Sequence, residues 1–284
     1  MRSRVISGAI IGVIAVLCGV FGGPLLAGVL FLCAVVAYDE LLKATGATEQ
    51  GKTLHLLSVA GYIAMVAYYA MITYFQTNSA QAFPDDIISR TILSILIVLL
   101  LTQMTIYVVT FPRYSITQVV FAFFCFLYGP VFLSYIYLAR ELRYGMYIYA
   151  LIFFCSWICD TCAYFAGWMF GRHKMAPVLS PKKTIEGALG GVIGSVILCT
   201  VTGLIMSLRA KEERVLLPFI IIGFFGSILS MIGDLAASAI KRNHHVKDYG
   251  NLIPGHGGIM DRFDSVIFIA PVIYYLAVTL LPML

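Results

Sequence analysis

Charged side chains are scarce in this sequence: aspartate, glutamate, lysine and arginine together make up 12% of its 284 residues. Hydrophobic residues make up 61%, and the mean hydropathy is +0.93. So few charges could not cover this much apolar surface in water, which excludes a soluble globular protein. The sequence also lacks an internal repeat, a low-complexity tract and a polar stretch long enough for a soluble domain.

Two further features are missing. No convincing small-residue cleavage site follows Arg2, Arg4 and the first apolar run, so we expect this run to stay as a membrane helix rather than to be removed as a signal peptide. The seven cysteines all lie inside apolar runs, and no disulfide framework is implied. Cys159 and Cys162 have the spacing of redox and metal motifs, but in an apolar helix we expect them to act as small hydrophobic residues.

What is present is a series of apolar runs of about 20 residues, each long enough for a helix to cross the roughly 30 Å hydrocarbon core. We expect helices near residues 5–22, 24–43, 54–75, 91–111, 116–138, 146–170, 185–208, 216–240 and 264–283. Gly22, Gly23 and Pro24 predict a tight turn between the first two. The sequence therefore predicts an all-α, polytopic integral membrane protein with about nine transmembrane helices.

The lysines and arginines indicate an orientation for these helices. Most of the 19 fall in alternate loops on the side of the N-terminus. The positive-inside tendency then predicts that the N-terminus and the loop at 241–263 face the cytoplasm. Two predicted helices separate this loop from the loop at 171–184, so both loops are expected on the same face of the membrane.

The charge that is present is concentrated between Ser238 and Asp264. This segment contains Lys241, Arg242, Lys247, Asp248, Asp261 and Arg262, with glycines at 250, 255, 257 and 258. Cations for phosphate, carboxylates for a metal and glycines for close backbone approach are what a phosphoryl or nucleotidyl transfer site needs. The cations could instead anchor the loop to anionic head groups, although interleaved acids serve that purpose less well than an unbroken basic run.

Two carboxylates, Asp160 and Asp234, lie inside apolar runs, where each costs at least about 2.5 kcal/mol on insertion scales. Such a residue usually faces a wet cavity, a cation or a helix partner. Ser238 and Lys241 follow Asp234 by four and seven residues, so all three share one helical face that leads from the membrane to the charged loop.

Asp261 and Asp264 are three residues apart and can project together from the start of the last predicted helix. The helix dipole alone would favour carboxylates there by about 0.3–1 kcal/mol. Together with Asp234, however, they provide the oxygen ligands that Mg²⁺ prefers, with positions left for water and substrate phosphate. We therefore expect a metal site formed by these three carboxylates.

Two short motifs have a structural and a functional interpretation. The run from Gly255 to Gly258 is either a flexible turn or a set of amides that approaches phosphate oxygens, with His256 as a hydrogen-bond donor to a phosphate. In the run from Ser180 to Gly187, a helix start with Ser180 or Thr184 as cap, Pro181 just inside and Glu186 in the first turn explains the pattern. Lysines at such a helix start oppose the dipole, which makes sense if an anion is bound there.

Together these residues resemble the full signature of the phosphatidate cytidylyltransferase (CDP-diacylglycerol synthase) family. The positions that carry the signature are Ser238, Lys241, Arg242, Lys247, Asp248, Gly250, Pro254, His256, Gly257, Gly258, Asp261, Arg262 and Asp264. Positions similar to the family's upstream motifs are Asp160, Thr161, Ala163, Tyr164, Gly167, Ser180, Pro181, Lys182, Lys183, Thr184, Glu186 and Gly187. The resemblance is specific over about residues 155–266, and the N-terminal half matches only as several apolar spans.

The resemblance implies that CTP condenses with phosphatidic acid to give CDP-diacylglycerol and pyrophosphate in phospholipid biosynthesis. It implies Mg²⁺ as cofactor, with a second, monovalent cation such as K⁺ as an option. The implied partners are CTP, phosphatidic acid and membrane lipids in a bacterial inner membrane, with a homodimer and without nucleic acid. Residues 1–145 are then N-terminal transmembrane helices for scaffold, lipid access and oligomer contacts, and residues 146–284 form the C-terminal catalytic transmembrane region.

The resemblance also implies roles for single residues. Metal ligands are Asp234, Asp261 and Asp264, which form the catalytic set together with Lys241 and Arg242. Substrate-binding residues are Asp160, Lys182, Lys183, Thr184, Glu186, Ser238, Lys247, Asp248, His256, Gly257, Gly258 and Arg262.

Two alternatives remain at this point. CTP-dependent polyprenol and phytol kinases share the upstream pattern loosely and would transfer the γ-phosphoryl group to a lipid alcohol. A transporter of a phosphorylated solute would line its pathway with the same charges, but transporters usually place charge near the midplane and show repeats.

Overall fold

The structure is a computed structural model that describes residues 2–47, 55–78, 86–211, 213–253 and 257–281. Within these ranges eight helices are long and apolar enough to cross a membrane, which confirms an all-α polytopic membrane protein. Helix α1 (Arg2–Phe21) coincides with the first predicted span, but its described apolar part is only Ser7–Phe21. The predicted count of about nine spans therefore stays a prediction.

The chain forms two compact units, Met1–Tyr137 with His244–Arg262, and Leu138–Asn243 with Phe263–Leu284. The predicted functional division into residues 1–145 and 146–284 is a different kind of boundary and stays a prediction. The polar segment from Ser238 to Asp264 is shared between the units, because its central part belongs to the first unit and both its ends belong to the second.

The first unit is built from helices that are apolar nearly all round. Its elements are α1, α2 (Gly23–Ala44), α3 (Leu56–Thr77), α4 (Ile87–Val109), α5 (Ile116–Phe126) and the π-helical turn η1 (Leu127–Val131), which leads into α6 (Phe132–Arg140). Gly22 and Gly23 take the positive φ values of 60° and 55° and form the tight turn that the sequence predicts between α1 and α2. In the core Tyr38 packs edge-on against Phe126, with ring centroids 6.2 Å apart.

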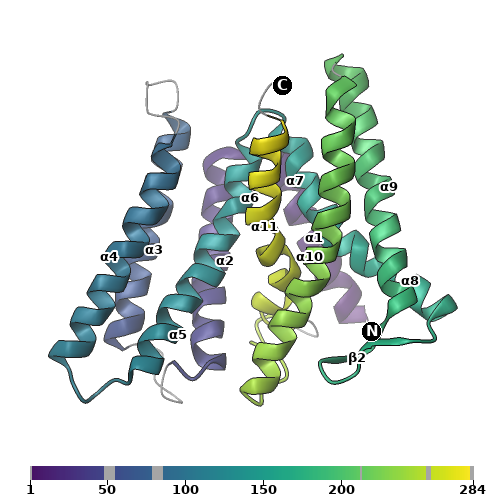
Figure 1. The fold of residues 1–284 in the computed structure, drawn as a ribbon. Coiled ribbons are helices and arrows are strands. Elements are labelled where there is room, and N and C mark those ends of the chain that lie inside the picture. The colour runs from purple at the N-terminus through teal and green to yellow at the C-terminus, as the bar shows by residue number, and fades with distance from the viewer. Residues whose placement is uncertain (1, 48–54, 79–85, 212, 254–256, 282–284) are drawn as a thin grey trace. The chain divides into compact units, whose positions relative to one another are not determined.

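The second unit contains three packed helices and a short hairpin. Its elements are α7 (Gly145–Phe153), the π-helical turn η2 (Phe154–Ile158), α8 (Cys159–Phe170), β1 (Lys174–Ala176), β2 (Ser180–Thr184), α9 (Ile185–Ala210), η3 (Glu213–Val215), α10 (Leu216–Asn243) and most of α11 (Met260–Leu280). Helix α9 packs against both α8 and α10, as the green ribbons show (Figure 1).

Glycines on α9 allow α8 to approach closely. A Cβ atom at Gly190 would lie 2.3 Å from Cβ of Ala166, and one at Gly194 would lie 2.5 Å from Sγ of Cys162. In lipid no hydrophobic effect drives helices together, and small residues instead allow the close van der Waals packing that holds them. Cys159 and Cys162 are free thiols on this packed face of α8, and Cys159 is fully buried.

The predicted helix start lies within the run from Ser180 to Gly187, with Glu186 in the first turn, but the placement of Pro181 just inside the helix is wrong. Residues Ser180–Thr184 form β2, which pairs antiparallel with β1. The residue before a proline is disfavoured in the α region, and this keeps Ser180 extended. The cap lies four residues later at Thr184, whose Oγ1 accepts a hydrogen bond from the Gly187 amide at 3.2 Å. Helix α9 then begins at Ile185, where the predicted span begins.

Candidate active site

The second unit encloses a cavity of about 420 Å³ at the junction of α8, β2, α9 and α10. Its polar lining consists of Asp160, Lys182, Lys183, Thr184 and Asp234. Apolar side chains, including the exposed rings of Tyr164 and Trp168, form the rest of the wall. A cavity that combines paired charges with an apolar wall suits a ligand that is both phosphorylated and partly apolar.

Lys183 and Asp234 form an ion pair across this cavity. Their side chains are 23% and 25% exposed, so the pair borders the cavity instead of being sealed in the core. Lys183 comes from β2 and Asp234 from α10, two elements that the sequence separates by the whole of α9. The structure thus brings together the lysine motif and one predicted metal ligand in the lining of one cavity.

Asp264, another predicted metal ligand, belongs to the same unit. Its carboxylate interacts electrostatically with Asp234, Lys241 and Asp160. The adjacent Ser265 hydroxyl shares a hydrogen bond of 2.6 Å with the Ser156 hydroxyl of η2, which fixes this turn of α11 against the other helices of the unit. Three carboxylates and two lysines of the second unit are therefore close enough to influence one another.

The end of α10 carries the next group of predicted residues. Helix α10 is continuous from Leu216 to Asn243, so Asp234, Ser238 and Lys241 share one face, as their spacing predicts. Lys241 and Arg242 occupy the last turn, where the helix dipole also favours cations. Antiparallel packing of α9 and α10 puts this turn at the end of the unit where the hairpin lies (Figure 1).

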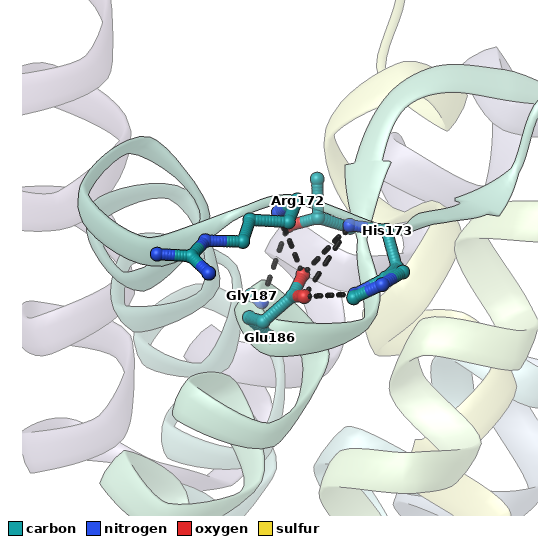
Figure 2. A network of polar contacts seen from close by, with 5 residues as sticks. Arg172, His173, Glu186 and Gly187 are labelled. Atoms are coloured by element: carbon teal, nitrogen blue, oxygen red, sulfur yellow. Dashed lines mark hydrogen bonds and ion pairs between the residues drawn. The ribbon is translucent and has the colours of Figure 1, made fainter.

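Glu186 holds the base of the hairpin (Figure 2). Its carboxylate accepts hydrogen bonds from the backbone amides of Arg172 and His173 at 3.1 to 3.3 Å. Its Oε1 also contacts Nδ1 of His173 at 2.6 Å. The structure therefore gives this predicted substrate-binding residue a direct role in positioning the hairpin that carries Lys182 and Lys183.

In the first unit, Asp261 organises the central part of the polar segment. Asp261 is 7% exposed, and its Oδ2 accepts hydrogen bonds from the amides of Tyr249 at 2.8 Å and Gly258 at 3.0 Å. One predicted metal ligand is thus already engaged with loop amides. The Gly258 amide, for its part, is directed to this carboxylate, which disfavours the interpretation that it approaches a phosphate.

The other predicted residues of this segment are placed as follows. Lys247 and Asp248 are exposed in the loop after α10. Gly257 has a φ of +84°, a conformation that side chains rarely adopt, and its carbonyl accepts a hydrogen bond from Ile253. Arg262 has a buried Nε without a hydrogen-bond partner in the described part of the chain, so this donor fits an anion. His256 lies outside the described residues.

Sequence reasoning missed Glu40 of α2. This residue is 6% exposed, and its carboxylate accepts hydrogen bonds from the amides of Ile259 and Met260 at the start of α11. The signal that could have found it is the one that singled out Asp160 and Asp234, a carboxylate within an apolar run.

The predicted metal ligands are divided between the two units. In the ranges described above, no group of three or more His, Cys, Asp and Glu residues is arranged to hold a metal ion. Asp234 and Asp264 belong to the second unit and Asp261 to the first. The predicted pocket shared by all three stays a prediction.

Comparison with known proteins matches residues 2–280 to the cytidylyltransferase family. A phosphatidate cytidylyltransferase of Bacillus subtilis is 33% identical over 279 residues, which cover 97% of this chain and 97% of the relative. One of Staphylococcus haemolyticus is 33% identical over 259 residues, with 90% and 91% covered. One of Synechocystis is 44% identical over 140 residues, with 49% and 46% covered. The similarity therefore extends well beyond residues 155–266.

Proposed function

Because the chain belongs to the cytidylyltransferase family, we propose that it acts as a phosphatidate cytidylyltransferase. The reaction joins CTP to phosphatidic acid and releases pyrophosphate. The structural observation that carries the proposal is the cavity lined by Lys182, Lys183, Asp160 and Asp234. Its charged lining fits phosphates, and its apolar wall of Tyr164 and similar side chains fits a lipid.

The chemistry requires positioning more than proton transfer. An oxygen of the lipid phosphate attacks the α-phosphorus of CTP, a P–O bond forms there, and the bond to the β-phosphate breaks as pyrophosphate leaves. The attacking oxygen is already ionised at neutral pH and needs little help from a base. Lys182, Lys183, Lys241, Arg242 and Arg262 neutralise the phosphate charge as it redistributes.

Mg²⁺ is part of the proposal. Asp234 and Asp264 fit it because they are hard oxygen ligands whose charges interact within the second unit. Asp261 remains the proposed third ligand, although its Oδ2 already accepts two amide hydrogen bonds. The ion would neutralise charge on the triphosphate when bound. A second, monovalent cation such as K⁺ stays an expectation from the family resemblance.

The same proposal places the reaction at the cytoplasmic face, where CTP is available. It is supported by the excess of lysine and arginine in loops on the side of the N-terminus. A bacterial inner membrane belongs to the proposal because the relatives are bacterial, a homodimer stays an expectation from the family resemblance, and nucleic acid has no part in the proposal.

Product analysis with purified protein tests the function. The protein in detergent is given Mg²⁺, phosphatidic acid and CTP that is labelled either in cytosine or in the γ-phosphate. We expect the cytosine label in the lipid and the γ label in pyrophosphate. Transfer of the γ label to a polyprenol or phytol supplied in place of phosphatidic acid would instead identify a lipid kinase, and no transfer of either label would contradict both.

A further inference from the structure

Glu40 lies near the end of α2 and contacts the start of α11 with both of its carboxylate oxygens. Oε1 accepts a hydrogen bond from the Ile259 amide at 3.1 Å, and Oε2 accepts one from the Met260 amide at 2.8 Å. The first amides of a helix have no partner within the helix, so a carboxylate there satisfies them and also meets the positive end of the helix dipole. All three residues belong to the first unit.

A second carboxylate completes this arrangement. Asp261 accepts hydrogen bonds from the amides of Gly258 and Tyr249. Three consecutive amides, those of residues 258, 259 and 260, are thus bound by side-chain carboxylates of the protein itself. The backbone path at the start of α11 is fixed by Glu40 and Asp261 together.

Two glycines of the polar segment make room for Glu40. A Cβ atom at Gly250 or at Gly258 would lie 2.2 Å from Oε1 of Glu40, a distance at which an atom must shift. The side chain of Glu40 therefore explains why both positions are glycine, without any appeal to flexibility or to a bound phosphate. The loop is folded around this carboxylate.

The neighbouring carboxylate on α2 has different surroundings. Asp39 is 29% exposed and forms an ion pair with Lys43, one turn further along the helix, at 2.5 Å. The two adjacent acids carry the same charge, but only Glu40 accepts hydrogen bonds from the start of α11. Asp39 therefore provides a matched control for a change of charge at this end of α2.

We propose that Glu40 is a positioning residue of the reaction, which orders residues 249–253, 257 and 258 and the first turn of α11, the helix from which Asp261, Arg262 and Asp264 project. Its kinetic part rests on the proposed function. Glu40 itself does not touch the substrate; it acts by holding the backbone to which the proposed metal ligands are attached.

Hydrogen exchange gives a test that does not depend on activity. In Glu40→Gln the amide group can accept with its oxygen only, so one of the two backbone amides loses its acceptor and faces an NH₂ group. We expect peptides that cover residues 249–262 to exchange at least about tenfold faster than in the wild-type protein, and peptides of α9 to be unchanged. Asp39→Asn should leave both regions unchanged.

Kinetics test the effect on the reaction. For folded Glu40→Gln protein, isolated as a single peak by size exclusion, we expect kcat at saturating CTP and phosphatidic acid to fall at least about tenfold. The Mg²⁺ concentration for half-maximal activity should rise severalfold. A residue with a merely structural role would lower the yield and the melting temperature, but would leave kcat and the Mg²⁺ dependence of the folded fraction unchanged.

A double-mutant cycle with Gly250→Ala tests whether the effect on kcat passes through the contact between the loop and the Glu40 carboxylate. In the wild-type background this change presses on the Glu40 carboxylate and should lower kcat, whereas in a Glu40→Ala background the space is open and the same change should add little.

Additive effects, or wild-type exchange and kinetics in Glu40→Gln, would overturn the inference. So would failure of both Glu40→Gln and Gly250→Ala to fold, because the residue would then serve folding. If the wild-type protein forms no CDP-diacylglycerol, the proposed function fails, and the exchange data alone decide whether Glu40 orders the loop.

Discussion

At the scale of single residues, the acidic side chains divide by what they contact. Asp234 pairs with a lysine at a partly exposed cavity wall, whereas Glu40 and Asp261 are buried and bind backbone amides. The Lys183–Asp234 pair lines the cavity, although Nζ of Lys183 is itself buried. A phosphate or a metal ion that enters the cavity would therefore compete directly for its members.

Lys183→Gln tests this. Loss of a charged contact to phosphate should lower kcat/KM for CTP by about 10–100-fold, in keeping with about 1.5–3 kcal/mol for hydrogen bonds to charged groups. The melting temperature should change little. Lys174→Gln on β1 removes the same charge from the hairpin outside the cavity lining, and should keep near wild-type activity. Equal kinetics for both variants would remove Lys183 from the site.

Asp261 requires a pair of variants, because it has a structural contact and a proposed metal role. Asp261→Asn keeps one carboxamide oxygen as acceptor for the amides of Tyr249 and Gly258 but loses the negative charge. We expect it to fold and to lose at least about 100-fold in Mg²⁺-dependent activity, since a metal ligand is lost. Asp261→Ala should also lower the melting temperature, because two buried amides lose their acceptor.

Activity of Asp261→Asn near the wild-type level, measured as CDP-diacylglycerol formed over a range of Mg²⁺ concentrations, would show that Asp261 serves the loop and not the metal. Asp86→Asn, in an exposed ion pair with Arg90, is a control for the removal of one carboxylate and should leave both measurements unchanged.

At the scale of elements, the close contact between α8 and α9 limits the size of the side chains that these helices can carry beside the cavity. Gly190→Ala would bring a methyl group to 2.3 Å from Cβ of Ala166. Overpacking of this kind costs about 1–3 kcal/mol, so thermal unfolding in detergent should occur at a lower temperature. Gly28→Ala on α2 has nothing within 4 Å of its added atom and should unfold like the wild type. A Gly190→Ala protein with unchanged stability would mean that the helices separate without cost.

Sequence patterns predicted the helices better than their ends. Long apolar runs fix the spans because a helix is the form that satisfies the backbone in lipid, and the start of α9 at Ile185 is predicted to the residue. The capping pattern leaves Ser180 and Thr184 both open as the cap, because both residues are hydroxylated and each is followed by a plausible first turn; in the structure the cap is Thr184. The β-hairpin depends on pairing between β1 and β2 and leaves no alternating pattern in such short strands.

The site was predictable where residues repeat along one helix and not where distant segments meet. The shared face of Asp234, Ser238 and Lys241 follows from the spacing within α10. The ion pair of Lys183 with Asp234 was expected only as a common location, and the contact of Glu40 with α11 was not expected at all. Such contacts depend on tertiary packing between segments far apart in sequence.

At the scale of the whole molecule, the distribution of charge predicts which side of the membrane carries the reaction. CTP does not cross a bilayer, so sealed inverted vesicles from cells that produce the protein should form CDP-diacylglycerol from added CTP. Right-side-out vesicles should do so only after permeabilisation with detergent, which also serves as the control for equal enzyme content. Activity in intact right-side-out vesicles would reverse the orientation inferred from the lysines and arginines.

The π-helical turn η2 sets the rotational phase of everything that follows it in its span. A π turn adds one residue to the helical ladder, and in the structure the Ser195 hydroxyl of α9 donates to the carbonyl of Phe154, where this turn begins, at 3.1 Å. Since each residue turns an α-helix by roughly 100°, removal of one residue from η2 would swing Asp160 away from the cavity and turn the face of Cys159 and Cys162 off α9. The direction in which α8 presents its carboxylate is thus determined by a single inserted residue one turn earlier.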